Sequence, residues 1–297
     1  MTATLSRGED AARTTYTVEA LRDREAIRGI LVQNRAYAAY ALAQLDPMMF
    51  DENEWYQSAG PSGNALLLHS RSGLGRALFA FGDPEALDVV LSLHPGPRFA
   101  FGSLYPEHRS VIEKYFVVTR PQTMYRMSVT KERFRPVSGE ARRLRGADVE
   151  AVNRIYSLDG GPAAYRPNHL EEGVYFGIEA GGRLRSIAGT HVVSRSERVA
   201  VVGNVFTHPR WRGGGLATEA TSAVTEEVLR YCDLVVLTVE EQNAPALNIY
   251  LKLGYETECT LHETPLIRKD PLGVTSLLRR AAAGWRGRRE GKEIVTR

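Results

Sequence analysis

The residues in this sequence best suited to chemistry are Arg212 and the three glycines that follow it, Gly213-Gly214-Gly215. Before them, residues 199–206 are rich in β-branched and aromatic side chains, which predicts a strand. After them, apolar residues recur at three- and four-residue steps over 216–229, which predicts one face of a helix. A turn between a strand and a helix presents unpaired N–H groups and the positive end of the helix dipole, which together suit a phosphate. Arg212 adds a full positive charge at the same place.

Two interpretations of this turn are open, a pyrophosphate site and a flexible turn that is rich in glycine for steric reasons alone. Two other glycine motifs fit poorly. A dinucleotide-binding turn ends on a glycine, and Thr218 stands at that position. A P-loop needs a lysine after its glycines, and none follows here.

A second group of residues comes after the strand-like run 234–239. Asn243 suits the N-cap of a helix, Pro245 suits its first turn, and Gly254 suits the position just past its end. Tyr250 lies inside this predicted helix. The chain therefore repeats the order strand, loop and helix.

The two groups together resemble the donor-binding motifs of the GNAT superfamily of N-acetyltransferases. Arg212, Gly215 and Ala217 match its pattern R-x-x-G-x-A, while Asn243, Ala246 and Tyr250 match N-x-x-A-x-x-x-Y. The resemblance covers roughly residues 140–265, and residues 203–215 look most like the FR47-like group, which resembles the C-terminal half of glycine N-acyltransferases. It implies an α/β (α+β) fold, a twisted mixed sheet, mostly antiparallel, flanked by helices.

The resemblance also implies which residues hold the acyl donor, acetyl-CoA. Backbone groups of Val205, Phe206 and Thr207 would bind the pantetheine arm and the acyl carbonyl, because the strand splays from its neighbour in this superfamily. The pyrophosphate would lie on the side chain of Arg212 and on backbone N–H groups of the turn and first helical residues, namely Gly213, Gly214, Gly215, Leu216, Ala217 and Thr218. Asn243 would contact the pantetheine end of the donor or serve only as the helix cap.

Tyr250 occupies the position of the general acid that protonates the departing thiolate in this superfamily. A phenol is a suitable donor because its pKa of about 10 lies close to that of a thiol, about 8.5. The structural alternative is a core aromatic beside Leu247 and Leu251.

The general base is left unassigned. Many relatives carry a glutamate on the strand before the Asn243 helix, and the equivalent residue here is Thr238, which cannot serve. Nearby alternatives are Glu240, Glu241, His191 and His208. A relay through ordered water is a further alternative, since aligned reactants supply much of the rate.

The length of 297 residues predicts about two domains. Residues 1–16 are expected to be disordered, 17–135 to form a degenerate GNAT-like half or a cap domain, and 139–270 to form the catalytic domain. The first half is expected to begin with a helix over 18–45, and residues 66–69 and 76–81 predict a hairpin. The cleft for the amine would be built from 165–170, the His191 strand and the N-terminal half.

Residues 271–297 form a basic C-terminal tail, with seven basic and two acidic residues and hence a net charge of +5. The whole chain carries +3, so the remainder carries −2 and lacks the charge excess of a nucleic-acid-binding fold. We expect a solvated tail with a short helix over 276–285, and contact with nucleic acid is the less favoured alternative.

Composition sets further expectations. Two cysteines provide neither a disulfide framework nor the spacing of a metal site, so no metal is expected. No apolar run approaches the length of about 18 residues that spans a bilayer, and no signal peptide is evident. We therefore expect a cytoplasmic monomer or homodimer without membrane contact.

The expected function is acyl-CoA-dependent N-acyltransfer, in which acetyl moves from acetyl-CoA to a primary amine of a small molecule or amino acid by direct attack in a ternary complex. Two alternatives remain, a non-catalytic protein that binds or senses acyl-CoA, and a protein or peptide N-acetyltransferase.

Overall fold

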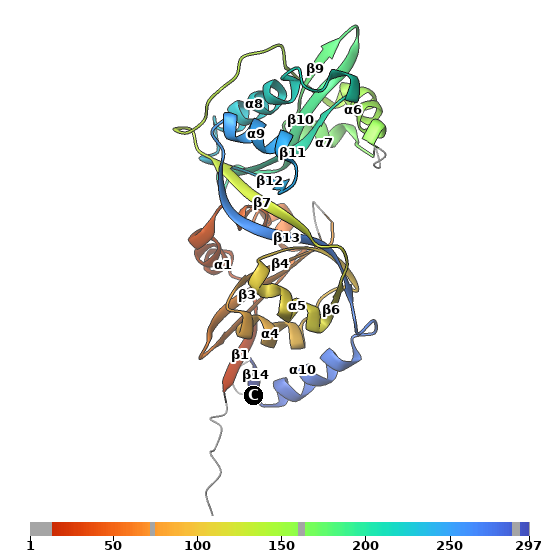
Figure 1. The fold of residues 1–297 in the computed structure, drawn as a ribbon. Helices are drawn as coiled ribbons and strands as arrows, with labels where there is room; N and C mark the ends of the chain where they lie inside the picture. Colours follow the sequence, from red (N-terminus) through yellow and green to blue (C-terminus); the bar gives the residue numbers. More distant parts are fainter. Residues whose placement is uncertain (1–13, 72–74, 160–163, 287–291, 297) are drawn as a thin grey trace, which may run out of the picture.

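The computed structural model describes residues 14–71, 75–159, 164–286 and 292–296, arranged as two lobes joined by long strands (Figure 1). Most of the segment 1–16, the turn of the hairpin at 72–74 and the glycine pair at 160–161 lie outside the described residues. Among the residues that the structure describes, no helix has the length and apolarity to cross a bilayer.

The N-terminal lobe, drawn in the lower part of Figure 1, is built from strands and short helices. Its elements are β1 (Thr15–Leu21), α1 (Arg24–Leu31), η1 (Val32–Asn34), α2 (Ala39–Ala43), α3 (Pro47–Phe50), β2 (Glu54–Gly60), β3 (Gly63–Ser70), β4 (Ala77–Gly82), α4 (Pro84–Leu93), β5 (Phe99–Leu104), η2 (Pro106–His108), α5 (Arg109–Tyr115) and β6 (Phe116–Val118). The chain then crosses to the other lobe along β7 (Gln122–Val129).

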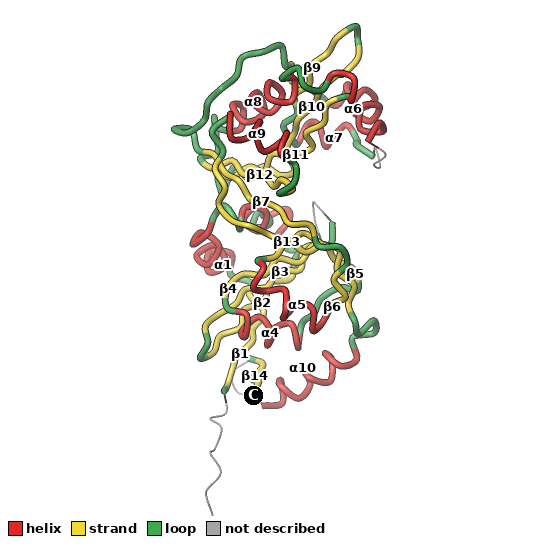
Figure 2. Tube along the Cα trace, in the orientation of Figure 1, coloured by secondary structure: helices red, strands yellow, loops and turns green. Residues whose placement is uncertain are grey.

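The C-terminal lobe follows a loop that contains no helix or strand between residues 130 and 141 (Figure 2). Its elements are β8 (Arg142–Arg143), η3 (Gly146–Asp148), α6 (Val149–Tyr156), η4 (Ser157–Asp159), α7 (Pro167–Glu172), β9 (Phe176–Ala180), β10 (Arg183–Ser194), β11 (Val199–Thr207), η5 (Pro209–Trp211), α8 (Leu216–Val228), β12 (Leu234–Glu240) and α9 (Ala244–Lys252). The chain returns along β13 (Glu256–Arg268) and ends in α10 (Val274–Arg286) and β14 (Glu293–Thr296).

The fourteen strands of the described residues form one sheet, in the order β14-β1-β2-β3-β4-β5-β13-β7-β12-β11-β10-β9-β8, with β6 paired to β13. Most neighbouring pairs are antiparallel, while β4 with β5 and β11 with β12 are parallel. The mixed, mostly antiparallel sheet flanked by helices is the fold class that the sequence predicted.

The two lobes share strands at their junction. β7 precedes the predicted boundary at 131–139, yet it lies between β12 and β13. β13 pairs with β7 through its first half and with β5 and β6 through its second half. Each lobe therefore depends on a strand that also completes the sheet of the other.

Side chains of β12 alternate between the two faces of the sheet, as the pleat requires. Val235 and Leu237 pack in the core that α8 and α9 cover. Val236 faces the other way and packs with Ala39 of α2, which comes from the N-terminal lobe. Helices from both ends of the chain thus cover opposite faces of the same strands.

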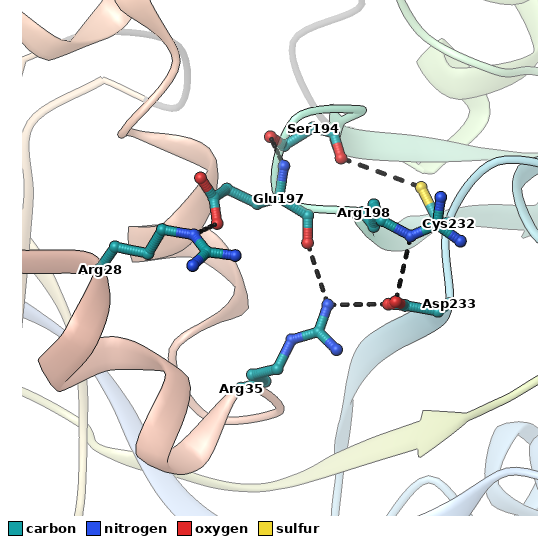
Figure 3. A network of polar contacts seen from close by, with 7 residues as sticks. All are labelled: Arg28, Arg35, Ser194, Glu197, Arg198, Cys232 and Asp233. Atoms are coloured by element: carbon teal, nitrogen blue, oxygen red, sulfur yellow. Dashed lines mark hydrogen bonds and ion pairs between the residues drawn. The ribbon is translucent and has the colours of Figure 1, made fainter. Parts of the chain in front are cut away.

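An ion-pair network fixes the N-terminal helices against the C-terminal lobe (Figure 3). Arg28 donates from Nε to Glu197 at 2.9 Å, and Arg35 donates to the carbonyl of Glu197 at 2.9 Å and to Asp233 at 2.8 Å. Arg198 pairs with the same Asp233 at 3.2 Å. Although burial alone would raise it, the pKa of Asp233 is lowered because Arg35 and Arg198 hold the carboxylate.

Two predictions about local structure are wrong. Residues 18–21, expected in the first helix, belong to β1, where Tyr16 and Val18 are buried and the strand pairs with β2 and β14. The described part of the tail is not solvated along its length, because β14 pairs with β1 and Ala283 of α10 is buried in the core. The expected helix at 276–285 lies within α10, and β3 and β4 form the expected hairpin.

Candidate functional site

The parallel strands β11 and β12 part in the middle of the C-terminal lobe. Only three residue pairs join them, the last being Val201 with Val236. β11 nevertheless continues to Thr207 and β12 to Glu240. Beyond the last pair, the backbone groups of β11 and β12 that face each other are therefore not paired in this parallel ladder. Such an open strand edge can form hydrogen bonds with an extended ligand.

A bulge in β11 frees further backbone groups at the same place. Gly203 pairs with Gly189 of β10 and Phe206 pairs with Ile187, which leaves Asn204 and Val205 without a partner in the register. Such an extra residue bends a strand and redirects its groups. Val205 therefore lies unpaired along both edges of β11, at the position where the resemblance places the acyl carbonyl.

Asn204 maintains this bulge, and sequence reasoning missed it. Its φ is +54°, a left-handed conformation that asparagine tolerates better than most residues. Its carbonyl accepts a hydrogen bond from the Tyr156 hydroxyl, and its Nδ2 donates to the Tyr175 hydroxyl at 3.3 Å. Its Oδ1 lies 3.2 Å from Nε2 of His191. An asparagine within a β-branched run was the one available signal.

The glycine turn adopts conformations that other residues avoid. Gly213 and Gly215 have φ values of +84° and +82°, and a Cβ built at either position would meet nothing within 4 Å. Conformation rather than crowding therefore calls for glycine. Gly215 is the N-cap of α8, a helix of 13 residues whose first N–H groups have no intrahelical partner. The turn is exposed, so these N–H groups are accessible.

Arg212 is held beside the end of β11. Its Nε donates to the carbonyl of Thr207 at 3.1 Å, and its guanidinium carbon lies 5.8 Å from the centre of the Phe206 ring. The carbonyl of Thr207 is therefore already engaged, and its hydroxyl lies 2.8 Å from that of Ser186. Arg212 itself is exposed, so the guanidinium is oriented by these contacts and still open to an anion.

The remaining predicted donor-binding residues differ in exposure. Phe206 and Thr218 are buried, whereas Leu216 and Ala217 are partly buried at the start of α8. Asn243 accepts a hydrogen bond from the N–H of Ala246 at 3.2 Å and so caps α9, as predicted from the sequence. The cap engages its Oδ1 and leaves its amide nitrogen for other contacts.

Tyr250 lies on α9 with its ring in the core, 6.0 Å from the ring of Tyr255. Burial raises the pKa of Tyr250 to about 12, so the phenol stays protonated throughout the neutral range. Within the described part of the chain, its hydroxyl forms no hydrogen bond. The ring is a core aromatic, as the structural alternative held, while the hydroxyl remains available to donate a proton.

Three of the candidate bases do not face the bulge in β11. His208 caps η5 by accepting from the N–H of Arg210 at 3.2 Å. Glu241 accepts a hydrogen bond from the Tyr125 hydroxyl at 2.6 Å, and Glu240 is exposed. Thr238 has a buried hydroxyl without a hydrogen-bond partner in the described structure.

His191 is the candidate base that the structure brings to the bulge. Its Nδ1 lies 2.6 Å from the Tyr40 hydroxyl, and its Nε2 faces the side-chain oxygen of Asn204. Because Nδ2 of Asn204 donates to Tyr175, its Oδ1 is the atom that accepts, which places the proton of the neutral imidazole on Nε2. The ring is partly open to solvent, yet the surrounding protein lowers the pKa of His191 below 6.5 by desolvating the charged form.

A cavity of about 360 Å³ lies between the lobes on the face opposite α8 and α9. Its walls come from seven helices and strands of both lobes and include Tyr40, Phe79, Phe101, Arg126, His191 and Glu263. The expected contribution of the His191 strand and the N-terminal half to a cleft is thus present, whereas residues 165–170 are not among its walls. His191 connects the cavity to the bulge through Asn204.

A larger groove of about 510 Å³ is lined by charged residues such as Arg143, Arg145 and Glu171. It includes none of the predicted donor-binding residues and lies away from the parted strands, so it is not the candidate site. In the described ranges, no group of three or more His, Cys, Asp or Glu side chains is arranged to hold a metal ion.

Comparison with known proteins finds one family model that matches part of the chain. Residues 149–255 match the model of the Acetyltransferase (GNAT) family. Among solved structures, a Drosophila protein is similar with a TM-score of 0.59 at 14% identity, covering 86% of this chain and 98% of that protein. A GCN5-related N-acetyltransferase from Sphaerobacter thermophilus has a TM-score of 0.55 at 15% identity, and the match covers 85% of this chain and 96% of the Sphaerobacter chain.

A third structure, a GCN5-related N-acetyltransferase from Kribbella flavida, gives a TM-score of 0.54 at 19% identity and covers 78% of this chain and 95% of its own. Identities this low establish likeness of fold alone. Among curated proteins, none matches the sequence. The likeness of fold extends beyond residues 149–255 into the N-terminal lobe, since these structures cover most of the chain.

Proposed function

We propose that the chain is a GNAT acetyltransferase, as the family match over residues 149–255 supports, and that it transfers an acetyl group from acetyl-CoA to a primary amine of a small molecule or amino acid. The observation that carries the proposal is the parting of β11 and β12 beside an exposed glycine turn at the start of α8. The FR47-like character of residues 203–215 is part of the same proposal.

The donor would lie between the parted strands. Its pyrophosphate would accept hydrogen bonds from the N–H groups of residues 213–218 and from Arg212, where the dipole of α8 favours negative charge. Its pantetheine arm would pair with the open edge of β11, and the N–H of Val205, a residue outside the register with β10, would polarise the acyl carbonyl. Asn243 would meet the pantetheine arm through its free amide nitrogen.

The amine would attack the acyl carbon from the cavity side. A tetrahedral intermediate forms, the carbon–sulfur bond breaks, and the thiolate takes a proton from the Tyr250 hydroxyl. The ammonium proton would pass to the Tyr40 oxygen as Tyr40 gives its own proton to Nδ1 of His191. Because burial raises the pKa of Tyr40 far above neutrality, the imidazole rather than the phenolate would hold the proton.

Thermal unfolding with acetyl-CoA and with free coenzyme A tests the donor site first. A ligand at 100 times its Kd adds roughly 2.7 kcal/mol to the free energy of unfolding, which raises the midpoint visibly. Thiol release across a panel of amines then tests turnover. A shift in midpoint without turnover on any amine would favour a sensor of acyl-CoA, and no shift with either ligand would refute the donor site.

A further inference from the structure

Arg126 of β7 is a cation buried inside the protein beside the cavity between the lobes. Its side chain is 1% exposed, and it lines the cavity together with Tyr40, Ser103 and Glu263. A buried charge costs several kcal/mol unless hydrogen bonds or an opposite charge compensate it. Its partners therefore show whether the cavity is complete without a ligand.

The hydrogen bonds of Arg126 are incomplete. Nη2 donates to the Ser103 hydroxyl at 3.3 Å, whereas Nε and Nη1 are buried and have no hydrogen-bond partner in the described structure. The guanidinium carbon lies 5.0 Å from the centre of the Tyr40 ring. A cation–π contact offsets part of the charge but leaves N–H donors unsatisfied.

Glu263 is the acidic side chain on the cavity wall, and it does not form a close ion pair with Arg126. It accepts a hydrogen bond from the Ser103 hydroxyl at 3.3 Å, so one serine stands between the two charged groups. Burial raises the pKa of Glu263, while Arg126 and Ser103 counteract this to a smaller extent. The carboxyl group of Glu263 therefore compensates the charge of Arg126 only indirectly, because the Ser103 side chain lies between them.

The rest of the cavity wall is mostly apolar, with Phe79 and Phe101 among its residues. At the other end, one tyrosine ring separates Arg126 from His191, because Tyr40 stacks under the guanidinium and contacts Nδ1 of His191 through its hydroxyl. His191 in turn contacts Asn204, next to the unpaired Val205. A molecule in this cavity thus lies between a buried cation, an apolar wall and the proposed acyl carbonyl position.

We propose that this cavity is the site of the amine substrate and that Arg126 binds a carboxylate of that substrate. The substrate class is a primary amine that carries a carboxylate and an apolar or aromatic body, as apolar amino acids do. A carboxylate supplies an acceptor oxygen to Nε or to Nη1, through a charge-assisted hydrogen bond that Arg126 otherwise lacks. The inference rests on the proposed function for the role of the amine, while carboxylate binding itself does not depend on turnover.

The first test compares amines that differ only in the carboxylate. L-Phenylalanine and L-leucine are compared with phenethylamine and isoamylamine by thiol release from acetyl-CoA, in the wild type, Arg126→Gln and Arg126→Met. We expect the wild type to prefer the amino acids, and both variants to lower kcat/KM for them by about 10- to 100-fold, the worth of a charge-assisted hydrogen bond. For the two simple amines the variants lose only the contact of Arg126 with Tyr40, so their kcat/KM should fall by at least about threefold less than that of the amino acids.

The second test measures binding without chemistry. 3-Phenylpropionate, which has the carboxylate and no amine, should raise the unfolding midpoint of the wild type and not of Arg126→Gln. Arg195→Gln is the matched control, because Arg195 also packs on a ring, 3.9 Å from that of Tyr231, outside the cavity. Arg126→Met shows whether a variant without the buried charge still folds.

The outcomes separate the two proposals. Equal preference for amines with and without a carboxylate, or a shift with 3-phenylpropionate that persists in Arg126→Gln, would overturn the carboxylate site and leave the transferase standing. Arg126-dependent binding of 3-phenylpropionate with no turnover on any amine would support the site while refuting the transferase.

Discussion

Arg126 on β7 and Thr238 on β12 lie directly opposite each other in an antiparallel pair. Residues so paired point to the same face of the sheet, and each has buried polar atoms without a hydrogen-bond partner in the described structure. β7 precedes the linker and β12 follows it, so the two halves of the chain contribute one residue each to this face. Arg126 also lines the cavity, and because the opposite half of the chain contributes His191 to the same wall, the wall is complete only when both lobes are folded together.

Replacing Arg212 by alanine should weaken acetyl-CoA binding by about 10-fold or more, because the pyrophosphate loses a charge-assisted hydrogen bond. Titration calorimetry at two salt concentrations measures this effect. Arg210→Ala is the control, since it removes the same charge from the same exposed turn. If both variants lose the same affinity, Arg212 acts only through general charge and not through a specific contact.

Gly215→Ala should strain the glycine turn, because its φ of +82° costs a residue with a Cβ roughly 1–2 kcal/mol. Space is not the limit, since a Cβ there meets nothing within 4 Å. Gly214, which does not need a positive φ, provides the control variant Gly214→Ala. Urea unfolding and acetyl-CoA affinity are measured for both, and equal behaviour of the two variants would contradict a conformational role for Gly215.

Tyr250→Phe should lower kcat by about 100-fold and leave the Kd for acetyl-CoA nearly unchanged, because only the proton donor is removed. With a pKa of about 12, the phenol should stay protonated, so the wild-type kcat should show no decline on the alkaline side between pH 7 and 9. Tyr255→Phe is the control, since that ring touches Tyr250 while its hydroxyl contacts Thr225. An unchanged kcat in Tyr250→Phe would remove this residue from the mechanism.

His191→Gln should reduce kcat by about 100-fold, because the Tyr40 hydroxyl loses the group that receives its proton. Since the pKa of His191 is lowered below 6.5, the wild-type kcat should hold through pH 6.5 and fall only under more acidic conditions, as the imidazole becomes protonated. His208→Gln, which affects a loop cap, should leave kcat close to the wild-type value. The decisive observation is that the fall in kcat at acidic pH, expected for the wild type, is absent from the pH profile of His191→Gln.

The free energy of unfolding should decrease as the pH is lowered, because of His69. This side chain is fully buried, and burial lowers its pKa to about 4. The unfolded chain takes up the proton near pH 6.5 and the folded chain only near pH 4. Above pH 6.5 this group therefore does not reduce the free energy of unfolding. As the pH falls to 4, it reduces that free energy by roughly 3 kcal/mol. Urea unfolding from pH 7 to 4 should show a weaker decline in His69→Gln, and an identical slope would rule out this cause.

The local structure of the proposed donor side was predictable from sequence because each part depends on nearby residues. A β-branched run, three glycines and an apolar helix face specify β11, the turn and α8 within the consecutive residues 199–228. Asn243 was likewise predictable, since a cap contacts an N–H three residues away. Proximity along the chain makes these interactions independent of the rest of the fold.

Other features needed the whole chain. The first strand was mistaken for helix, because its pairing partners β2 and β14 lie far away in sequence. The packing of α10 and β14 on the N-terminal lobe was missed for the same reason. Asn204 was passed over because its three partners come from α6, from β10 and from the residue that precedes β9.

The sequence by itself determined the resemblance to the GNAT superfamily and the strand, turn and helix of the proposed donor site, since short-range pattern and backbone conformation decide them. Only the tertiary structure decided where the amine could bind. It sets β7 between β12 and β13, buries Arg126, and brings Tyr40 to His191 across 151 positions of the chain. Such contacts depend on strand pairing and burial between distant segments, which no local pattern encodes.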